Sequence, residues 1–217
     1  MDQLLPGDQN LLRDRSEEVW LDSGCVLLSA QSTEFFAYFL LTANVALVVR
    51  NHNGYGLAVG LIGSEGAVGL QLGLGMGPGV ISYQVQDAGW ARRIAAPALQ
   101  QFLQKRASAL LVCARYFWVA SQEVVAMATS AQTQDIQARL AAWIVLSALR
   151  SKAPTLILTQ THLADMLGVR RASVTLAALE LKAKGLVAYR RGKVSILDSA
   201  GLQAIALTTR GRAEPPN

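Results

Sequence analysis

The sequence predicts an α+β chain with an N-terminal antiparallel β-roll of the jelly-roll type, a long helix and a C-terminal winged helix-turn-helix. Three observations predict this order. Short apolar runs alternate with turn residues as far as Trp90, which is typical of antiparallel strands. Helical spacing begins after Pro97. A helix, a glycine turn and a second helix follow around Gly168. We expect three domains, at residues 1–102, 103–131 and 132–217.

Composition and charge indicate a well-buried globular chain with a basic C-terminal part. The hydrophobic fraction is 52% and the charged fraction 16%, the reverse of what disordered chains show. Residues 1–150 carry ten Lys or Arg and eleven Asp or Glu, which sum to −1, whereas residues 151–217 carry ten and four, which sum to +6. Positive charge that is gathered in one segment is typical of a nucleic-acid-binding module.

The sequence predicts a cytoplasmic protein without a membrane-spanning segment. The apolar run 35–49 is shorter than the about 20 residues that a span needs, and the N-terminus lacks the order of a signal peptide. The two cysteines, Cys25 and Cys113, are too few for a disulfide framework or a four-thiolate metal site. We expect reduced thiols and no cofactor. The first ten residues and residues 210–217 are too polar to pack.

Eight glycines lie between Gly60 and Gly79 and interrupt the strand pattern. Glycines of this kind form the corners of a barrel, and this is the interpretation that we favour. The alternative is a loop whose backbone N–H groups hold a phosphate. The candidate residues for a small-ligand pocket are Gly63, Glu65 and Gly66.

The predicted long helix carries a four-three repeat of large and small side chains. Its positions are Leu103, Ala107, Leu110, Ala114, Phe117, Ser121 and Val124. A sustained heptad repeat is typical of a coiled coil, so we predict a dimerisation helix and a parallel homodimer. A second apolar face consists of Leu111, Val112, Trp118, Val119 and Val125. A helix that is apolar on two sides needs two partners, so packing on the chain's own β-roll also stays open.

Residues 158–198 predict two helices joined by a tight turn. Thr159 is a suitable N-cap for the first helix. Gly168 follows it and can take the positive φ that such a turn requires. The second helix is predicted to begin at Arg170 or Arg171. This spacing is the helix-turn-helix pattern.

The hairpin after the second helix has Arg191 and Gly192 at its tip, so the unit is a winged helix. An arginine at the start of the second helix can bind guanine in a major groove. Hydroxyl and amide groups at the start of the first helix suit phosphate contacts, and the cations of the wing suit the DNA backbone. The predicted DNA-binding residues are Thr159, Gln160, Thr161, Arg170, Arg171, Ser173, Thr175, Arg190, Arg191 and Lys193.

Simpler interpretations of these basic groups stay open. Arg170 and Arg171 also fit a solvated helix start, although cations there oppose the helix dipole, and the wing also fits an ordinary basic hairpin. No convergent set of titratable residues indicates catalysis, so we predict that the chain is not an enzyme. His52 and His162 stand apart from any nucleophile or metal partner, and no metal site is predicted.

A resemblance to a known family rests on two segments, TQTHLADMLGVRRASVTLAALELKAKGLVAYRRGKVSILD (159–198) and IQARLAAWIVLSAL (136–149). They resemble the Crp/Fnr superfamily of bacterial transcription regulators, and the likeness extends from about Val19 to Leu207. The resemblance implies a cyclic-nucleotide-binding-like β-roll and a long helix at a homodimer interface. It also implies double-stranded DNA with a palindromic operator as a partner, and RNA polymerase as a further one.

Departures from the family pattern change the expected signal and operator. In cyclic-nucleotide-binding members a Gly-Glu pair is followed by an arginine that holds the phosphate. Here Glu65-Gly66 stands near that pair, and no Lys or Arg occurs between Arg50 and Arg92. We therefore expect a regulator that is not gated by cyclic AMP; the alternative is one whose β-roll binds an unidentified small effector. Leu176 replaces a polar side chain that reads bases in many members, so a familiar operator is not expected.

Overall fold

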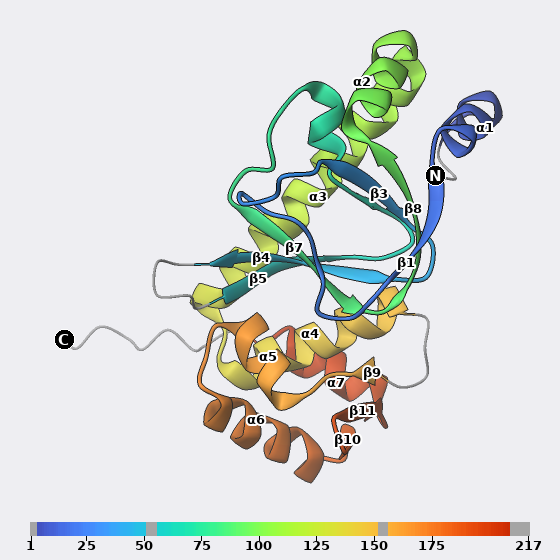
Figure 1. Cartoon of the computed structure of the whole chain (residues 1–217). Coiled ribbons are helices and arrows are strands. Elements are labelled where there is room, and N and C mark those ends of the chain that lie inside the picture. Colours follow the sequence, from blue (N-terminus) through green and yellow to red (C-terminus); the bar gives the residue numbers. More distant parts are fainter. Residues whose placement is uncertain (1–3, 51–55, 152–155, 209–217) are drawn as a thin grey trace. The chain divides into compact units, whose positions relative to one another are not determined.

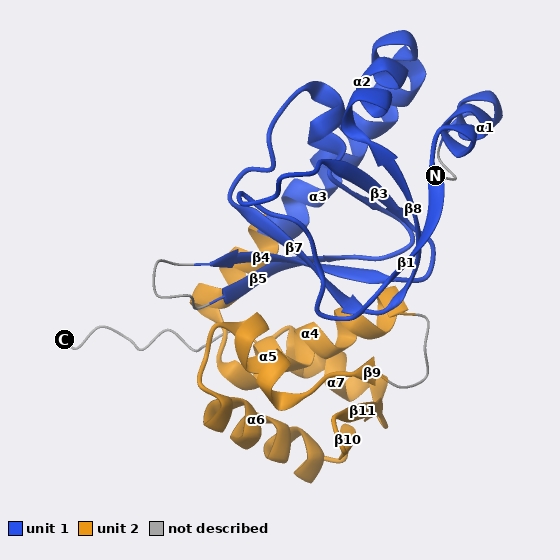
Figure 2. Cartoon of the chain, viewed as in Figure 1, with its two compact units in different colours: residues 1–124 blue, residues 125–217 orange. Residues whose placement is uncertain are grey.

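The computed structural model describes residues 4–50, 56–151 and 156–208 (Figure 1). The chain divides into two compact units, residues 1–124 and 125–217, which Figure 2 colours separately. The division by contacts falls inside a long helix. The domains expected at residues 1–102, 103–131 and 132–217 were defined by their predicted functions, whereas the two units are defined by contacts. The expected domain limits therefore remain predictions.

Unit 1 contains two antiparallel four-stranded sheets, in agreement with the predicted jelly-roll-like α+β class. The first sheet has the strand order β1 (Glu17–Leu21), β8 (Gly89–Ala95), β3 (Phe36–Leu40) and β6 (Ala67–Val68). The second has the order β2 (Val26–Leu28), β7 (Ile81–Asp87), β4 (Asn44–Arg50) and β5 (Gly56–Ile62). The apolar runs of the sequence account for most of these strands.

Strand β3 separates two hydrophobic cores. Successive side chains of a strand point to opposite faces, and in β3 they enter different clusters. Tyr38 and Leu40 join the interior of the roll, together with residues of both sheets. Ala37 and Phe39 join an outer core with residues of the helices α1, α2 and α3. Strand β3 is therefore buried on both faces of the first sheet.

Helix α1 (Pro6–Asp14) overturns the expectation that the first ten residues are too polar to pack. Proline at the first helical turn suits a helix start. Leu4 and Leu12 are buried in the outer core. Asp8 is only 3% exposed, and its carboxylate accepts a hydrogen bond from Ser108 Oγ at 2.6 Å. Apolar contacts of Leu4 and Leu12, and polar contacts of Asp8 with residues far along the chain, thus make this segment part of the core.

Two helices stand where one unbroken repeat was expected. Helix α2 spans Ala96–Lys105, and α3 spans Ala107–Thr133. Arg106 has φ −133° and ψ 83°, which ends α2. Leu103 therefore lies in α2, where it is buried in the outer core, and its assignment to the predicted dimer seam is wrong.

Helix α3 packs on unit 1 with one face and exposes the other. Phe117 and Val124 belong to the predicted seam, yet they pack against the outer core and the roll interior respectively. Leu111, Trp118 and Val125 are exposed instead. The remaining seam positions Ala107, Leu110, Ala114 and Ser121 are also exposed. Among the described residues, α3 is the one helix long and apolar enough to cross a membrane, judged by length and composition alone.

Unit 2 is a helical domain with a small three-stranded antiparallel sheet. Its elements after α3 are α4 (Ile136–Ser151), β9 (Leu156–Ile157), α5 (Gln160–Leu167), α6 (Arg171–Ala183), β10 (Val187–Arg190), β11 (Lys193–Ile196) and α7 (Ser199–Ala206). The strand order is β10-β11-β9. This is the predicted winged helix-turn-helix, to which α7 is an addition that packs on α4.

Candidate nucleic-acid interface

The turn between α5 and α6 follows from local sequence. Thr159 Oγ1 accepts a hydrogen bond from the backbone N–H of His162 at 3.1 Å, which caps α5. Gly168 has φ 64° and ψ 37°, a left-handed conformation that glycine adopts without steric cost. Helix α6 then begins after Arg170, whose side chain makes no cap hydrogen bond. The two arginines at this helix start are both exposed.

Helix α6 buries one face and presents the other. Val174, Ala177 and Leu181 recur at helical spacing and are buried, so the opposite face points away from the core. The exposed residues include Arg171 at the helix start and, five residues later, Leu176, which is 63% exposed. The exposed surface of α6 is therefore mixed, with a cation at its start and an apolar side chain further along.

The wing has the geometry of a two-residue hairpin. Arg190 pairs with Lys193 across β10 and β11. Arg191 and Gly192 form the turn with φ values of 50° and 77°, and two positive φ angles fit the hairpin turn whose twist matches its strands. Arg190, Arg191 and Lys193 are all exposed. Three cations are thus held within one tight loop.

Backbone contacts join the wing tip to the start of α5. Strand β11 pairs with β9, and the N–H of Leu158 donates to the carbonyl of Gly192 at 2.9 Å. A Cβ atom on Gly192 would lie 3.2 Å from Cγ2 of Thr159. The turn of the wing and the N-cap of α5 are therefore neighbours.

A side-chain hydrogen bond joins α5 to α6. Thr175 Oγ1 lies 2.9 Å from Gln160 Oε1 and 3.0 Å from the carbonyl oxygen of Arg171. The hydroxyl has one proton, so it donates to one of these acceptors at a time. Gln160 and Thr175 are half-buried, as is Ser173, whereas Thr159 and Thr161 are exposed. These contacts bring the starts of both helices together.

The cations of this face are not neutralised within the described part of the chain. No ion pair that the described residues form involves any of Arg170, Arg171, Arg190, Arg191 and Lys193. Cations without acidic partners give a surface that attracts phosphate. The described residues also contain no group of three or more His, Cys, Asp or Glu side chains that could hold a metal ion, and His52 lies outside them.

Two contacts that the sequence did not indicate fix the helix-turn-helix on α4. The guanidinium of Arg139 donates to the carbonyl of Leu167, at the end of α5. Lys184 Nζ, just after α6, donates to Gln137 Oε1 at 3.0 Å. Both partners stand in the first turn of α4. Nothing in local spacing signals these contacts, because they join elements that lie tens of residues apart.

Comparison with known proteins assigns this domain. A family model of the Crp-like helix-turn-helix domain matches residues 138–205. A transcriptional regulator assigned to the Crp/Fnr family, from Eubacterium rectale, has the same fold over 95% of this chain and 97% of its own, with a TM-score of 0.74 and 15% identity. Residues 138–205 are therefore a Crp-like helix-turn-helix domain, and the chain as a whole has the fold of this regulator. The resemblance seen in the two sequence segments is thereby confirmed.

Two further regulators share the fold over most of the chain. A CRP-family transcriptional regulator of Thermus thermophilus is 19% identical, covers 90% of this chain and 100% of its own, and has a TM-score of 0.72. The c-di-GMP responsive global regulator CLP of Xanthomonas campestris is 17% identical, covers 88% and 98%, and has a TM-score of 0.66. No curated protein matches the sequence.

The candidate ligand residues are only partly brought together. Glu65 and Gly66 line a pocket, and Gly63 is not among its lining residues. The N–H of Gly63 instead donates to Glu65 Oε1 at 2.8 Å, which holds the carboxylate in place. Each of the three has a defined position, but only two of them can face a ligand in this pocket.

Proposed function

We propose that this chain is a homodimeric transcription regulator of the Crp/Fnr type, which reads a palindromic operator in double-stranded DNA. One observation carries the proposal. The start of α5, the start of α6 and the tip of the wing are linked by contacts, and they carry five exposed cations that form no ion pair within the described residues. A helix that presents its first turn beside a basic hairpin fits a major groove with phosphates on both sides.

The roles of the side chains follow from their chemistry. Arg171, at the exposed start of α6, is suited to the O6 and N7 atoms of guanine. Thr159 and Thr161 stand at the start of α5, where hydroxyl and backbone N–H groups suit a phosphate. Arg190 and Lys193 flank the wing tip and suit the DNA backbone. Gln160 and Thr175 bond to each other and position the two helices.

The proposed dimer forms through the exposed face of α3. Leu111, Trp118 and Val125 are seven residues apart and exposed, and the small residues Ala114 and Ser121 lie between them. This is a heptad row, shifted by one position from the one that the sequence suggested, and such a row packs against a second helix. Two-fold symmetry would place two copies of α6 about one helical turn of DNA apart.

A second copy of the chain suits this face better than lipid does. The face is interrupted by exposed Arg115 and by polar Gln122, and a charge within a membrane is costly. We therefore propose a cytoplasmic protein. The resemblance to Crp/Fnr regulators also leads us to propose RNA polymerase as a further partner. We assign no catalytic activity to the chain.

Selection of bound DNA from a random pool tests this function. The purified protein is incubated with the pool at near-physiological salt, with and without cyclic nucleotides, and the retained DNA is sequenced. A palindromic motif in both arms supports an operator reader that needs no cyclic nucleotide. Retention of DNA without any enriched motif would contradict the proposal, because charge alone would then account for binding.

Lys193→Ala should reduce the salt dependence of DNA binding. Removal of one phosphate contact lowers the slope of log affinity against log salt by about one unit and weakens binding evenly across sequences. Lys105→Ala is the matched control, because Lys105 is an exposed lysine of unit 1. Titrations at several salt concentrations measure both slopes. An unchanged salt slope for Lys193→Ala would show that Lys193 of the wing does not contact the DNA backbone.

Cyclic AMP should not bind tightly. The interior of the roll is lined by apolar side chains and Tyr38, and the segment between Arg50 and Arg92 has no cation. Arg93, which follows Arg92, is bound to Glu17 at 2.5 Å. A buried phosphate without a cation loses its strongest hydrogen bonds. Calorimetric titration measures this affinity, and a sub-micromolar dissociation constant would overturn the expectation.

A further inference from the structure

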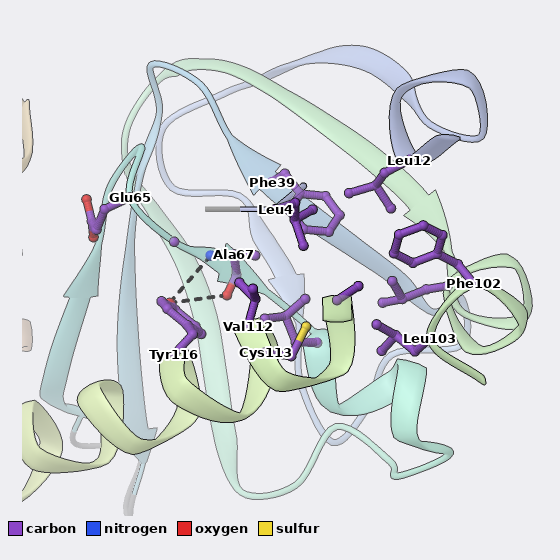
Figure 3. A pocket seen from close by; sticks show the side chains of 14 residues that line it. Leu4, Leu12, Phe39, Glu65, Ala67, Phe102, Leu103, Val112, Cys113 and Tyr116 are labelled. Carbon is purple, nitrogen blue, oxygen red and sulfur yellow. Dashed lines mark hydrogen bonds between the residues drawn. The ribbon is translucent and has the colours of Figure 1, made fainter. Parts of the chain in front are cut away.

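We propose that the outer core of unit 1 contains a binding site for a small, uncharged, apolar effector, formed between α1, α2, α3 and β3. The pocket is a partly open cavity of about 50 Å³, which suits a small ligand, and most of its lining is apolar. The site itself stands on its own geometry, and only its regulatory meaning rests on the proposed function. Figure 3 shows Leu12, Phe39 and Phe102 at one end of the pocket, and Tyr116 beside Ala67 at the other.

This site is distinct from the interior of the roll. Phe39 lines the pocket, while its neighbours Tyr38 and Leu40 point into the roll interior. Consecutive residues of a strand face opposite sides of the sheet. The pocket therefore lies on the outer face of the first sheet, where α1 and α2 cover it with Leu12 and Phe102.

The lining selects against charge. No Lys, Arg or His is among the described residues that line the pocket, so an anion would find no cationic partner there. Glu65 is the one acidic residue of that lining, and Figure 3 shows it at the edge, beyond Tyr116 and Ala67. A carboxylate at the edge repels anions further. A cation would lose its hydration against the apolar remainder of the lining. A ligand that fills the pocket is therefore apolar and uncharged.

Tyr116 supplies a hydrogen bond that a ligand could take over. Its hydroxyl lies 3.4 Å from both the N–H and the carbonyl oxygen of Ala67, which is long for such bonds. Burial raises the pKa of this hydroxyl, so it stays protonated and neutral. A ligand with one carbonyl or amine group would have a partner here. The remainder of the lining recognises shape and apolar surface.

Contacts of α1 connect the pocket to α3. Leu12 is on α1, Leu4 lies just before it, and both line the pocket. Asp8 of α1 accepts a hydrogen bond from Ser108 at 2.6 Å and lies 3.6 Å from Arg106 Nε. Ser108 stands in the first turn of α3, which carries the proposed dimer row. A compound that displaces α1 would therefore act on the start of the dimer helix.

Fluorescence of N-phenyl-1-naphthylamine, an uncharged apolar probe, tests the site on the whole chain. We expect saturable binding of one probe per chain and a blue shift of its emission. Cys113→Leu fills the pocket and should weaken binding by about tenfold or more. Cys25→Leu is the matched control at the exposed cysteine and should leave binding unchanged. Equal loss in both variants, or no saturable binding, would overturn the proposal.

Two further measurements locate the probe and test the charge preference. In a Cys25→Ser background, bound probe should slow alkylation of Cys113 by iodoacetamide. This result stands even if Cys113→Leu fails to fold, and absence of protection would place the probe elsewhere and refute the site. The sulfonated relative 8-anilinonaphthalene-1-sulfonate should bind about tenfold more weakly or worse; equal affinity would refute the preference for uncharged ligands. Neither measurement uses DNA, so failure here and failure of operator binding are distinguishable.

Discussion

Trp118→Glu should convert the dimer into monomers. Trp118 is 69% exposed at the centre of the row that Leu111 and Val125 complete. In the proposed dimer each chain buries this indole against its partner, and loss of a buried tryptophan costs about 3–5 kcal/mol. Two carboxylates would also face each other across the interface. We expect the dimer dissociation constant to rise by about 100-fold or more, measured by light scattering after size-exclusion chromatography over a range of concentrations.

Trp20→Glu is the matched control for this change. Trp20 lies on β1 and is 51% exposed, so the same substitution is made at an exposed indole outside α3. The control should remain dimeric. The Trp118→Glu variant should bind a full operator with the affinity of a single half-site, because each monomer carries one α6. A Trp118→Glu variant that stays dimeric at low concentration would show that α3 is not the interface.

Arg171→Ala should cost about 1–3 kcal/mol of operator binding and relax the preference at one base position. Arg171 opens the exposed face of α6, and Thr175 bonds within one turn of it, so its backbone is well fixed. Affinities for the selected operator and its single-base variants measure both effects. If Arg171 contacts a base, the preference for that base should weaken at one operator position and stay unchanged at the others.

The control for Arg171→Ala is Arg15→Ala, at an exposed arginine of unit 1. This variant should bind the operator and all its single-base variants as the unchanged protein does. An equal loss by Arg171→Ala on every sequence would assign Arg171 to a phosphate. An unchanged operator affinity of Arg171→Ala would contradict the proposal that α6 lies in the major groove.

The helix-turn-helix was predictable because its signals are local. Thr159 caps α5, Gly168 takes the left-handed turn, and Arg191 and Gly192 close the wing. Each of these follows from the chemistry of one or two adjacent residues. Helix α1 was not predictable in this way. Its buried Asp8 depends on Ser108, one hundred residues away, and no local pattern reports such a partner.

The proposed dimer row of α3 differs by one position from the predicted seam for a related reason. The helix has apolar side chains on two faces. The periodicity of the sequence indicates both faces, but it does not indicate which of them packs on the core of the same chain. Phe117 and Val124 pack on unit 1, so the proposed dimer row passes to their neighbours. Strand β8 was also hidden, because Arg92 and Arg93 interrupt its apolar pattern. Glu18 and Glu17 pair with these arginines across β1.

The alternation of β3 makes residue parity informative about function. Odd positions such as Ala37 and Phe39 belong to the core beside the pocket, and even positions such as Tyr38 and Leu40 belong to the roll interior. Substitutions at neighbouring positions of β3 therefore alter two different hydrophobic cores. One short strand thus allows the interior of the roll and the α1 pocket to be altered independently.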